Sequence, residues 1–378
     1  MLDYMTLKFL WWLIVGVLLI GFAIMDGHDM GVGILLPLLG KNDTERRIMI
    51  NTVAPHWDGN QVWFITAGGA IFAAWPFVYA TAFSGMYWAL LLVLFALFFR
   101  PVGFEYRSKL PDPAWRRGWD LGIFTGSAVP ALVFGVAFGN LLLGVPFYLD
   151  DTMRSFYTGS FWALLNPFAL VCGVASLSML TLQGASFLSH RSDGALRQRA
   201  VQAGSIAAIA LLIALSVAGV IVSNLDGFVI KSIPDVNSSI NPLMKEVSRQ
   251  TGAWLGNYQR YPVLWAIPAL AYAAALLTLL LLRSGKTLAA FVTSSVTCAS
   301  VILNAGVALF PFILPSSSTP QSSLTVWDAT SSLVTLRVMF VVALIFTPIV
   351  LGYTAWAYRV MRGTVTGDYI RANDKHLY

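Results

Sequence analysis

The chain has 378 residues, of which 57% are hydrophobic and only 11% are charged. This composition is too apolar for a soluble protein, and the chain is too long for a single membrane anchor, so it indicates a polytopic membrane protein. The formal net charge is +6, but the basic residues are spread between apolar runs rather than gathered on one face. That distribution argues against a nucleic-acid-binding protein.

Nine apolar windows are long enough to cross a bilayer, since a helix needs about 20 apolar residues to span a core of about 30 Å. We therefore expect an all-α protein whose residues 1–378 form a single integral membrane domain of nine transmembrane helices. Only Pro76 and Phe77 separate the second window from the third, which predicts a tight helical hairpin. The windows are roughly 7–26, 49–75, 78–100, 119–143, 161–188, 202–224, 261–282, 288–311 and 335–358.

The first apolar run is longer than the roughly 7–15-residue core of a signal peptide and lacks a basic stretch before it, so we expect it to stay as a helix. Cys172 and Cys298 both lie in apolar runs without a Cys-x-x-Cys or Cys/His spacing. Neither a disulfide framework nor a zinc site is therefore indicated for the two cysteines.

The lysines and arginines predict the orientation, because cytoplasmic loops carry an excess of them. Nine spans place the two termini on opposite sides of the membrane. One side collects 17 of the 24 basic residues. The other side keeps Lys8, Arg154, Lys231, Lys245, Arg249, Arg260 and Arg337. We therefore expect the N-terminus outside and the C-terminus in the cytoplasm.

Two segments on the outer side are predicted to be loops. Segment 225–260 carries turn dipeptides and mixed charges and is predicted to be a polar loop with one short helix. Residues 314–323 are rich in Ser and Pro and are predicted to be a connector.

The fourth window contains two G-x-x-x-G motifs, Gly122/Gly126 and Gly135/Gly139. This spacing lets helices approach closely. We favour packing within this chain, and a contact with another subunit is the alternative.

The stretch Ala54-Pro-His-Trp-Asp-Gly-Asn-Gln-Val-Trp63 is polar although it lies inside an apolar window. Counted from Arg47, Asp58 is 11 residues into that window, which is roughly 16 Å along a helix and close to mid-depth. A carboxylate at that depth costs about 3 kcal/mol on insertion scales. Asp58 should therefore have a partner, a water-filled path or a proton of its own.

The first window ends in Asp26-Gly-His-Asp29. Asp26 and Asp29 would share a helix face if the helix continues past Gly27. Counted from Lys8, Asp26 should sit near the cytoplasmic boundary. Carboxylates at a cytoplasmic mouth and at mid-depth are what a proton path into the membrane requires. The alternative for Asp26 and Asp29 is a helix cap or a pair with an arginine.

The cytoplasmic end of the third window adds Arg100, Glu105 and Arg107, which could form a mixed-charge mouth for such a path. The four histidines are His28, His56, His190 and His376. A b-type haem between helices needs axial His or Met ligands, and His28 and His56 are the only histidines near a span. Hydrogen bonding to a neighbour is the favoured role for both, with haem ligation as the alternative.

No P-loop, dinucleotide fingerprint, G-x-S-x-G or H-E-x-x-H motif lies on a suitable element. The chain instead resembles the family of cytochrome bd ubiquinol oxidase subunit II over nearly its full length. The motifs that carry the resemblance are Phe9-Leu-Trp-Trp, Asp26-Gly-His-Asp-Met-Gly-Val-Gly, Asn42-Asp-Thr-Glu-Arg-Arg, Ala54-Pro-His-Trp-Asp-Gly-Asn-Gln-Val-Trp63, Gly68-Gly-Ala-Ile-Phe-Ala-Ala-Trp-Pro76, Phe98-Phe-Arg-Pro-Val-Gly-Phe-Glu105-Tyr-Arg, Gly252-Ala-Trp254 and Trp327-Asp-Ala-Thr-Ser-Ser.

The resemblance implies a multi-pass subunit of a bacterial inner-membrane quinol oxidase, paired with a haem-bearing subunit I and in some members with a small single-span subunit. Two b haems and haem d would belong to subunit I, and a ubiquinone could be bound structurally in this chain. By position, Asp58, Asp29 and Asp26 would match the proton route and Trp63 the oxygen route. The chain departs at His28, where the family pattern more often has an aromatic residue.

Two rival interpretations follow from the residues alone. A proton-coupled secondary transporter would also place acidic residues at mid-depth and break its helices with Gly and Pro. A structural scaffold would leave Asp58 dispensable. We expect the oxidase subunit, with no independent catalytic site and no metal site in this chain.

Overall fold

The structure is a computed structural model that describes residues 3–232, 241–373 and 377–378. In those ranges the longer helices are α1 (Tyr4–Leu39), α2 (Asp43–Val53), α3 (Trp57–Ala74), α4 (Pro76–Gly85), α5 (Tyr87–Tyr106), α6 (Pro113–Leu143), α7 (Pro167–Arg191), α8 (Gly194–Asn224), α10 (Ala266–Arg283), α11 (Thr287–Leu309) and α12 (Leu333–Val360), and the short ones are α9 (Gly256–Arg260) and α13 (Gly367–Ala372). The strands are β1 (Phe147–Leu149), β2 (Ser155–Tyr157), β3 (Asp226–Ser232), β4 (Glu246–Thr251), β5 (Phe312–Leu314) and β6 (Leu324–Thr325).

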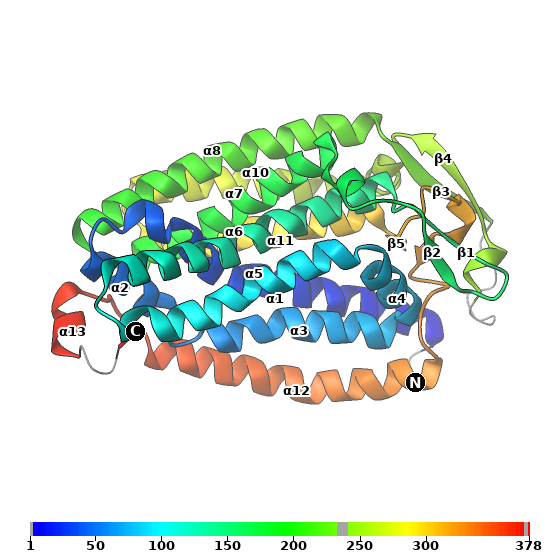
Figure 1. Ribbon diagram of the computed structural model, residues 1–378. Coiled ribbons are helices and arrows are strands. Elements are labelled where there is room, and N and C mark those ends of the chain that lie inside the picture. The colour runs from blue at the N-terminus through cyan, green and yellow to red at the C-terminus, as the bar shows by residue number, and fades with distance from the viewer. Residues whose placement is uncertain (1–2, 233–240, 374–376) are drawn as a thin grey trace.

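The long helices run side by side in one bundle, with α1 packed against α3, α6, α7 and α11 (Figure 1). In the described part of the chain, eight helices are long and apolar enough to cross a membrane, and the bent pair α3 and α4 gives nine if it is counted as one span. Figure 1 places the two ends of the chain at opposite ends of the bundle. The prediction of an all-helical polytopic membrane protein is confirmed. The sidedness of the two ends stays a prediction.

The hairpin between the second and third windows is not the two-residue turn that the sequence predicted. A 119° bend separates α3 from α4, and α4 itself forms the turn before α5 begins at Tyr87. Pro76 is the first residue of α4, where its missing N–H costs nothing. The third span is therefore α5, and residues 78–85 belong to the turn.

The first helix continues 13 residues beyond the predicted end at Asp26, to Leu39. Glycines let it pass between its neighbours. A Cβ on Gly31 would lie 2.2 Å from the carbonyl oxygen of Leu180 in α7, and a Cβ on Gly184 would lie 2.3 Å from the carbonyl carbon of Gly31. Helices α1 and α7 therefore touch backbone to backbone, which places the Asp26–Asp29 segment inside the bundle.

The second window is not one helix. Helix α2 ends at Val53, three residues outside regular helix follow, and α3 begins at Trp57. Pro55 explains the break, because it has no backbone N–H to donate to the preceding turn of the helix. The remaining six windows each coincide largely with one helix, from α6 to α12.

Among the described residues, the end of the bundle that holds the N-terminus carries three two-stranded antiparallel hairpins, β1–β2, β3–β4 and β5–β6 (Figure 1). The predicted polar loop 225–260 contains the pair β3–β4, which the sequence analysis missed, and the short helix α9, and residues 233–240 lie outside the described part. The indole of Trp254 donates to the carbonyl of Leu142 over 2.9 Å and so ties this segment to the end of α6.

The glycine motifs of α6 pack within this chain, as the sequence predicted. A Cβ on Gly126 would lie 2.6 Å from the Ala96 carbonyl oxygen of α5. Equivalent atoms on Gly135 and Gly139 would lie 2.2 Å from Cys172 and 2.6 Å from Ala169 of α7. Both cysteines are free.

Candidate functional site

Asp26 of α1 pairs with Arg100 of α5 inside the bundle. The two guanidinium nitrogens lie 3.0 and 2.5 Å from the two carboxylate oxygens, and neither side chain is more than 1% exposed. Pairing with an arginine is the alternative that the sequence left open for Asp26. Asp26 does not lie at the end of a helix, because α1 continues for three and a half further turns, or about 20 Å.

Asp29 lies one turn further along α1 and faces a different neighbour. Its Oδ2 accepts a 2.7 Å hydrogen bond from the amide of Asn60 in α3. Its Oδ1 lies 3.3 Å from Nε2 of His28 and 3.7 Å from Nδ1 of His56 and has no hydrogen bond of good geometry within the described residues. The helix does continue past Gly27, and both carboxylates are buried, each with its own set of partners.

Tyr358, near the end of α12, completes this cluster. Its hydroxyl lies 3.3 Å from Nε2 of His28, 3.4 Å from Nδ1 of His56 and 2.8 Å from the amide nitrogen of Asn60. The Tyr358 ring stacks on His56 with 4.6 Å between centroids. We call these five side chains, from His28, Asp29, His56, Asn60 and Tyr358, the histidine–aspartate cluster.

His28 and His56 are therefore engaged by neighbouring side chains, as the sequence analysis favoured. Nδ1 of His28 lies 2.9 Å from the carbonyl oxygen of Ile24, one turn back along α1. Phe187 of α7 packs on the His28 ring at 4.2 Å between centroids. His190 lies 3.3 Å from the Thr287 hydroxyl, and His376 lies outside the described residues.

Asp58 does not lie at mid-helix. The depth count from Arg47 assumed one continuous helix, and that assumption is wrong because the chain breaks at Pro55. Asp58 sits in the first turn of α3 with its side chain exposed on this chain, two residues from the buried Asn60. The same helical turn thus presents an acidic group outward and an amide inward.

Glu105 is also exposed, near the end of α5. Its Oε1 accepts a 2.9 Å hydrogen bond from the hydroxyl of Tyr378. Partial burial, this hydrogen bond and the negative charges of Glu105 and Asp58 all raise the pKa of the Tyr378 hydroxyl. Tyr378 therefore lies within the electrostatic field of both exposed carboxylates.

The carbonyl of Tyr378 accepts hydrogen bonds from Arg47 at 3.0 Å and from Asn51 at 2.8 Å, both on α2. These bonds fix Tyr378 against α2 close to the predicted mouth. Nothing in the order of residues signalled this contact, since Tyr378 and Asn51 are 327 residues apart.

Arg107 belongs to a different ion-pair network, at the end of the bundle near α2. Asp120 of α6 accepts from Arg107 at 2.5 Å and from Arg46 at 2.7 Å, and Asp43 lies 3.1 Å from Arg107. Arg107 is fully buried and Asp120 is 1% exposed. Asp120 was not predicted from the sequence. The network fastens α2 to α6 and to the turn that follows α5.

Trp63 of α3 packs on α1 at Gly21. A Cβ on Gly21 would lie 2.4 Å from the indole ring, so only glycine leaves room for it. The adjacent Phe64 forms a cluster with Phe22 and Phe134, with ring centroids 5.0 to 5.3 Å apart. Trp63 is partly buried against the same core.

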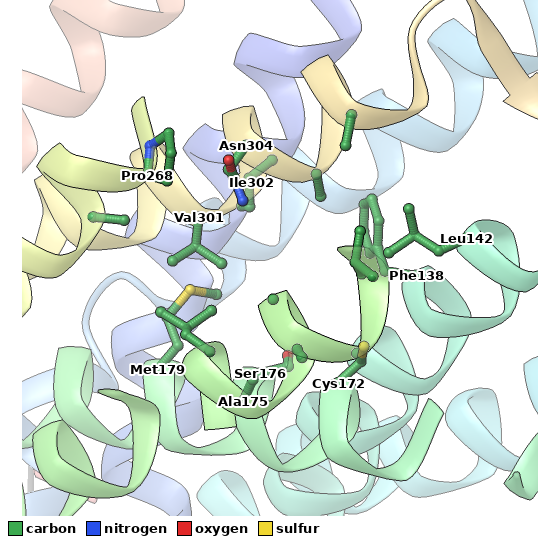
Figure 2. Close-up of a pocket in the computed structure, with 18 of the residues that line it drawn as sticks. Phe138, Leu142, Cys172, Ala175, Ser176, Met179, Pro268, Val301, Ile302 and Asn304 are labelled. Carbon is green, nitrogen blue, oxygen red and sulfur yellow. The ribbon is translucent and has the colours of Figure 1, made fainter. Parts of the chain in front are cut away.

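A cavity of about 510 Å³ lies beyond these aromatic rings, between α1, α6, α7, α8, α10 and α11. Figure 2 shows α7 side chains such as Met179 and Cys172 on one side of it and Val301 and Ile302 of α11 on another. The lining is mostly apolar, and Tyr258 and Asn304 are among its few polar groups. A long apolar molecule with a small polar end fits these walls.

Comparisons with known proteins show the family of the chain. A family model described as cytochrome bd terminal oxidase subunit II matches residues 7–361. The chain is 57% identical over 379 residues to cytochrome bd-I ubiquinol oxidase subunit 2 of Escherichia coli K12, with all of both chains covered. It is 32% identical over 365 residues to cytochrome bd ubiquinol oxidase subunit 2 of Bacillus subtilis, covering 96% of this chain and 97% of the relative.

A solved structure of the bd oxidase from Geobacillus thermodenitrificans superimposes with a TM-score of 0.65 at 12% identity. The match covers 92% of this chain and 98% of that one, which shows a common fold. The chain therefore belongs to the family of cytochrome bd ubiquinol oxidase subunit II and is a multi-pass membrane subunit of that bacterial oxidase complex.

Proposed function

We propose that this chain supports a haem-bearing subunit I, supplies part of the proton route from the cytoplasm and lines part of the oxygen route. Reduction of one oxygen molecule to two water molecules consumes four electrons and four protons. The electrons would come from quinol at the partner subunit, where the family resemblance places two b haems and haem d. The protons must cross part of the membrane to reach that site.

The position of α3 carries the proposal for protons. Its first turn bears the exposed Asp58, and two residues later Asn60 donates to the buried Asp29 over 2.7 Å. Glu105 and Tyr378 would gather protons at the surface and Asp58 would pass them inward. Asn60, His56 and Tyr358 are polar groups that would hold the intervening water or proton near Asp29.

Asp26 and Arg100 have a supporting role in this proposal. Their two-point ion pair is buried, so neither group is available as a free proton carrier while the pair is intact. Because the pair is neutral overall, it would add little net charge beside Asp29. The pair would also hold α1 against α5, which fixes the position of the route.

Replacing Asp58 by asparagine in the complete complex tests the route. Asn has the same shape and cannot carry the proton. We expect the complex to assemble with its haem spectrum intact and quinol oxidation to slow by about tenfold or more, a barrier increase of at least about 1.4 kcal/mol. Asp58→Glu should restore much of the rate.

The matched control is Asp151→Asn, an exposed aspartate at the opposite end of the bundle. It should leave turnover unchanged. A fully active Asp58→Asn complex would contradict the proton-route proposal and favour the scaffold alternative.

The oxygen route is proposed along the contact of α1 with α3. The Gly21–Trp63 contact and the cluster of Phe22, Phe64 and Phe134 form an apolar seam beside the cavity. Oxygen is a small apolar molecule and partitions into such surroundings more readily than into water. Trp63 would set the width of this seam.

We assign a structural ubiquinone to the 510 Å³ cavity. Its volume is within the range of small-molecule sites, roughly 300–1,000 Å³. The apolar walls suit an isoprenoid tail. The Tyr258 hydroxyl donates to Asn304 Oδ1 over 2.7 Å, which leaves the amide N–H groups of Asn304 as donors for a ring oxygen. The transporter alternative is not retained, because relatives that match the full chain are oxidase subunits.

A further inference from the structure

Four potential ligand atoms of the histidine–aspartate cluster lie close together. Four separations between them are 3.3 Å from His28 Nε2 to Asp29 Oδ1, 3.7 Å from His56 Nδ1 to Asp29 Oδ1, and 3.3 and 3.4 Å from the Tyr358 hydroxyl to the two imidazole nitrogens. Ligands bonded to zinc at about 2.0–2.1 Å in a tetrahedron are about 3.3–3.4 Å apart. These four separations are close to the edges of such a tetrahedron, and the ligand atoms of His28, Asp29 and His56 all lie within 4.8 Å of one another.

The lone pairs of these atoms face one another, and the Tyr358 hydroxyl has a single hydrogen to offer them. Nδ1 of His28 must carry its hydrogen, because the carbonyl of Ile24 at 2.9 Å can only accept. In a neutral ring, Nε2 is then an acceptor facing Asp29 Oδ1, which has no well-formed hydrogen bond in the described ranges. Nδ1 of His56 lies 3.1 Å from the amide nitrogen of Asn60, but the two hydrogens of that amide have shorter contacts, with Asp29 Oδ2 at 2.7 Å and with the Tyr358 hydroxyl at 2.8 Å. A cation at the centre satisfies His28, Asp29 and His56 together.

The surrounding groups hold the donors in place. The bond from His28 Nδ1 to the Ile24 carbonyl fixes the ring orientation, and the bond from Asn60 fixes the carboxylate through its other oxygen. Such outer contacts are a regular feature of metal-binding histidines and carboxylates. Phe187 covers the His28 ring at 4.2 Å and excludes water from that side. His56 is next to the exposed Pro55 and is itself 9% exposed, so the cluster lies close to the surface of this chain.

We propose that His28, Asp29 and His56 bind a divalent transition-metal ion, with the Tyr358 hydroxyl or a water in the fourth position. Two imidazoles and one carboxylate suit zinc and its first-row neighbours and are poor ligands for magnesium or calcium. One carboxylate against a divalent ion leaves a single positive charge, in a site whose neighbouring Asp26–Arg100 pair is neutral overall. The inference goes beyond the proposed function, because a bound ion would occupy Asp29 at the inner end of the proposed proton route and would block that route. The site is read out by binding, independently of turnover.

Zinc binding to the purified complex tests the proposal. The complete complex, stripped of loose metal by a chelator, is titrated with Zn²⁺ against a chromophoric competitor. We expect the wild type to bind one equivalent more than His28→Phe, whose affinity at this site should fall by more than the roughly 10–100-fold of an outer-contact loss. Phe retains the packing against Phe187. Mg²⁺ should not compete.

Two further variants separate ligation from folding. His190→Gln removes a half-buried histidine outside the cluster and should keep the extra equivalent. Tyr358→Phe keeps the ring stack on His56 and loses only the hydroxyl, so it should weaken binding by about tenfold. X-ray absorption at the zinc edge of the wild-type complex should show two imidazole ligands at about 2.0–2.1 Å.

Equal zinc stoichiometry and affinity in the wild type and His28→Phe would overturn the proposal. So would a zinc spectrum without two imidazoles, which decides the question even if His28→Phe fails to assemble. If the cluster holds only a proton, no equivalent of zinc is lost in any of the variants, and the metal site is refuted.

Discussion

The ion pair between Asp26 and Arg100 has both charges out of contact with solvent. Removing one partner of a buried pair leaves the other uncompensated, which costs about 3–5 kcal/mol. We therefore expect Asp26→Asn to lower the apparent unfolding temperature of the complex markedly, as followed by intrinsic fluorescence. The double variant Asp26→Leu, Arg100→Leu should be less destabilised than either single variant. If Asp26→Asn unfolds like the exposed Asp151→Asn control, the pair contributes little to stability.

The contribution of Glu45 to the stability of the protein depends on pH, and the sign of this dependence follows from its pKa. Partial burial raises the pKa of its carboxylate, but the hydrogen bonds from Arg199 and from the backbone N–H of Lys41 outweigh this and lower the pKa below 4.5. A lowered folded pKa stabilises the protein above the unfolded value, and this stabilisation is lost as pH falls through the folded value. We expect Glu45→Gln to lower stability by about 1 kcal/mol or less at pH 7.

That stability difference between wild type and Glu45→Gln should shrink as pH falls below 4.5, in unfolding temperatures measured across the pH series. Glu246→Gln, at an exposed position in β4, is the control. A stability difference between wild type and Glu45→Gln that grows as pH falls would contradict this prediction.

The partners of single residues were the least predictable feature. His28, Asp29 and His56 lay in stretches that the sequence marked as polar and unusual, so they could be named in advance. Tyr358 could not be, since it lies 330 residues from His28 in an apolar helix. The same holds for Asp120, whose pairing with Arg46 spans 74 residues. Local sequence patterns contain no information on such long-range pairs.

At the scale of elements, the length of the apolar stretches predicted where helices lie, but it did not predict where a helix is interrupted. Pro55 and Pro76 both indicated an interruption of the helix, because proline has no backbone N–H with which to continue it. The second apolar window nevertheless has a continuous composition, and this hid the separation of α2 from α3. The depth assigned to Asp58 was wrong for that reason. The short hairpin β3–β4 was missed because it lies among polar turn residues.

The contact of α1 with α7 positions the histidine–aspartate cluster. Because a Cβ on Gly184 would lie 2.3 Å from the backbone of Gly31, Gly184→Ala must push the two helices apart. We expect a destabilisation of about 1–3 kcal/mol, typical of overpacking. The apparent unfolding temperature and the yield of assembled complex measure it. Gly16→Ala has open space around the new methyl group and should be neutral or slightly stabilising.

At the scale of the whole molecule, one bundle holds two different interiors. The half near α2 and α13 contains the Asp26–Arg100 and Arg107–Asp120 ion pairs and the histidine–aspartate cluster. The apolar cavity lies among α6, α7, α8, α10 and α11 and reaches α1 through Phe22. Helix α1 contributes to both interiors, with Phe22 toward the cavity and Asp26 and Asp29 toward the polar groups. Its single long span therefore connects the proposed quinone and proton regions.

A large side chain introduced into the cavity tests whether a quinone occupies it. Gly219 of α8 lines the cavity, and a Cβ added to it would have no neighbouring atom within 4 Å, so Gly219→Phe would extend a ring into the space. We expect the ubiquinone that copurifies with the complex, extracted and quantified against haem, to fall by about one equivalent. Because this quinone is structural, oxidase turnover should fall less than occupancy does.

Gly118→Phe provides the matched control for that substitution. Gly118 is an exposed helical glycine in α6 with open space around it, and it is not part of the cavity wall. It should retain the wild-type quinone content. If both variants keep the same content, the cavity is not the quinone site. If Gly219→Phe instead abolishes turnover while its haem spectrum is intact, the bound quinone takes part in electron transfer and is not a structural cofactor.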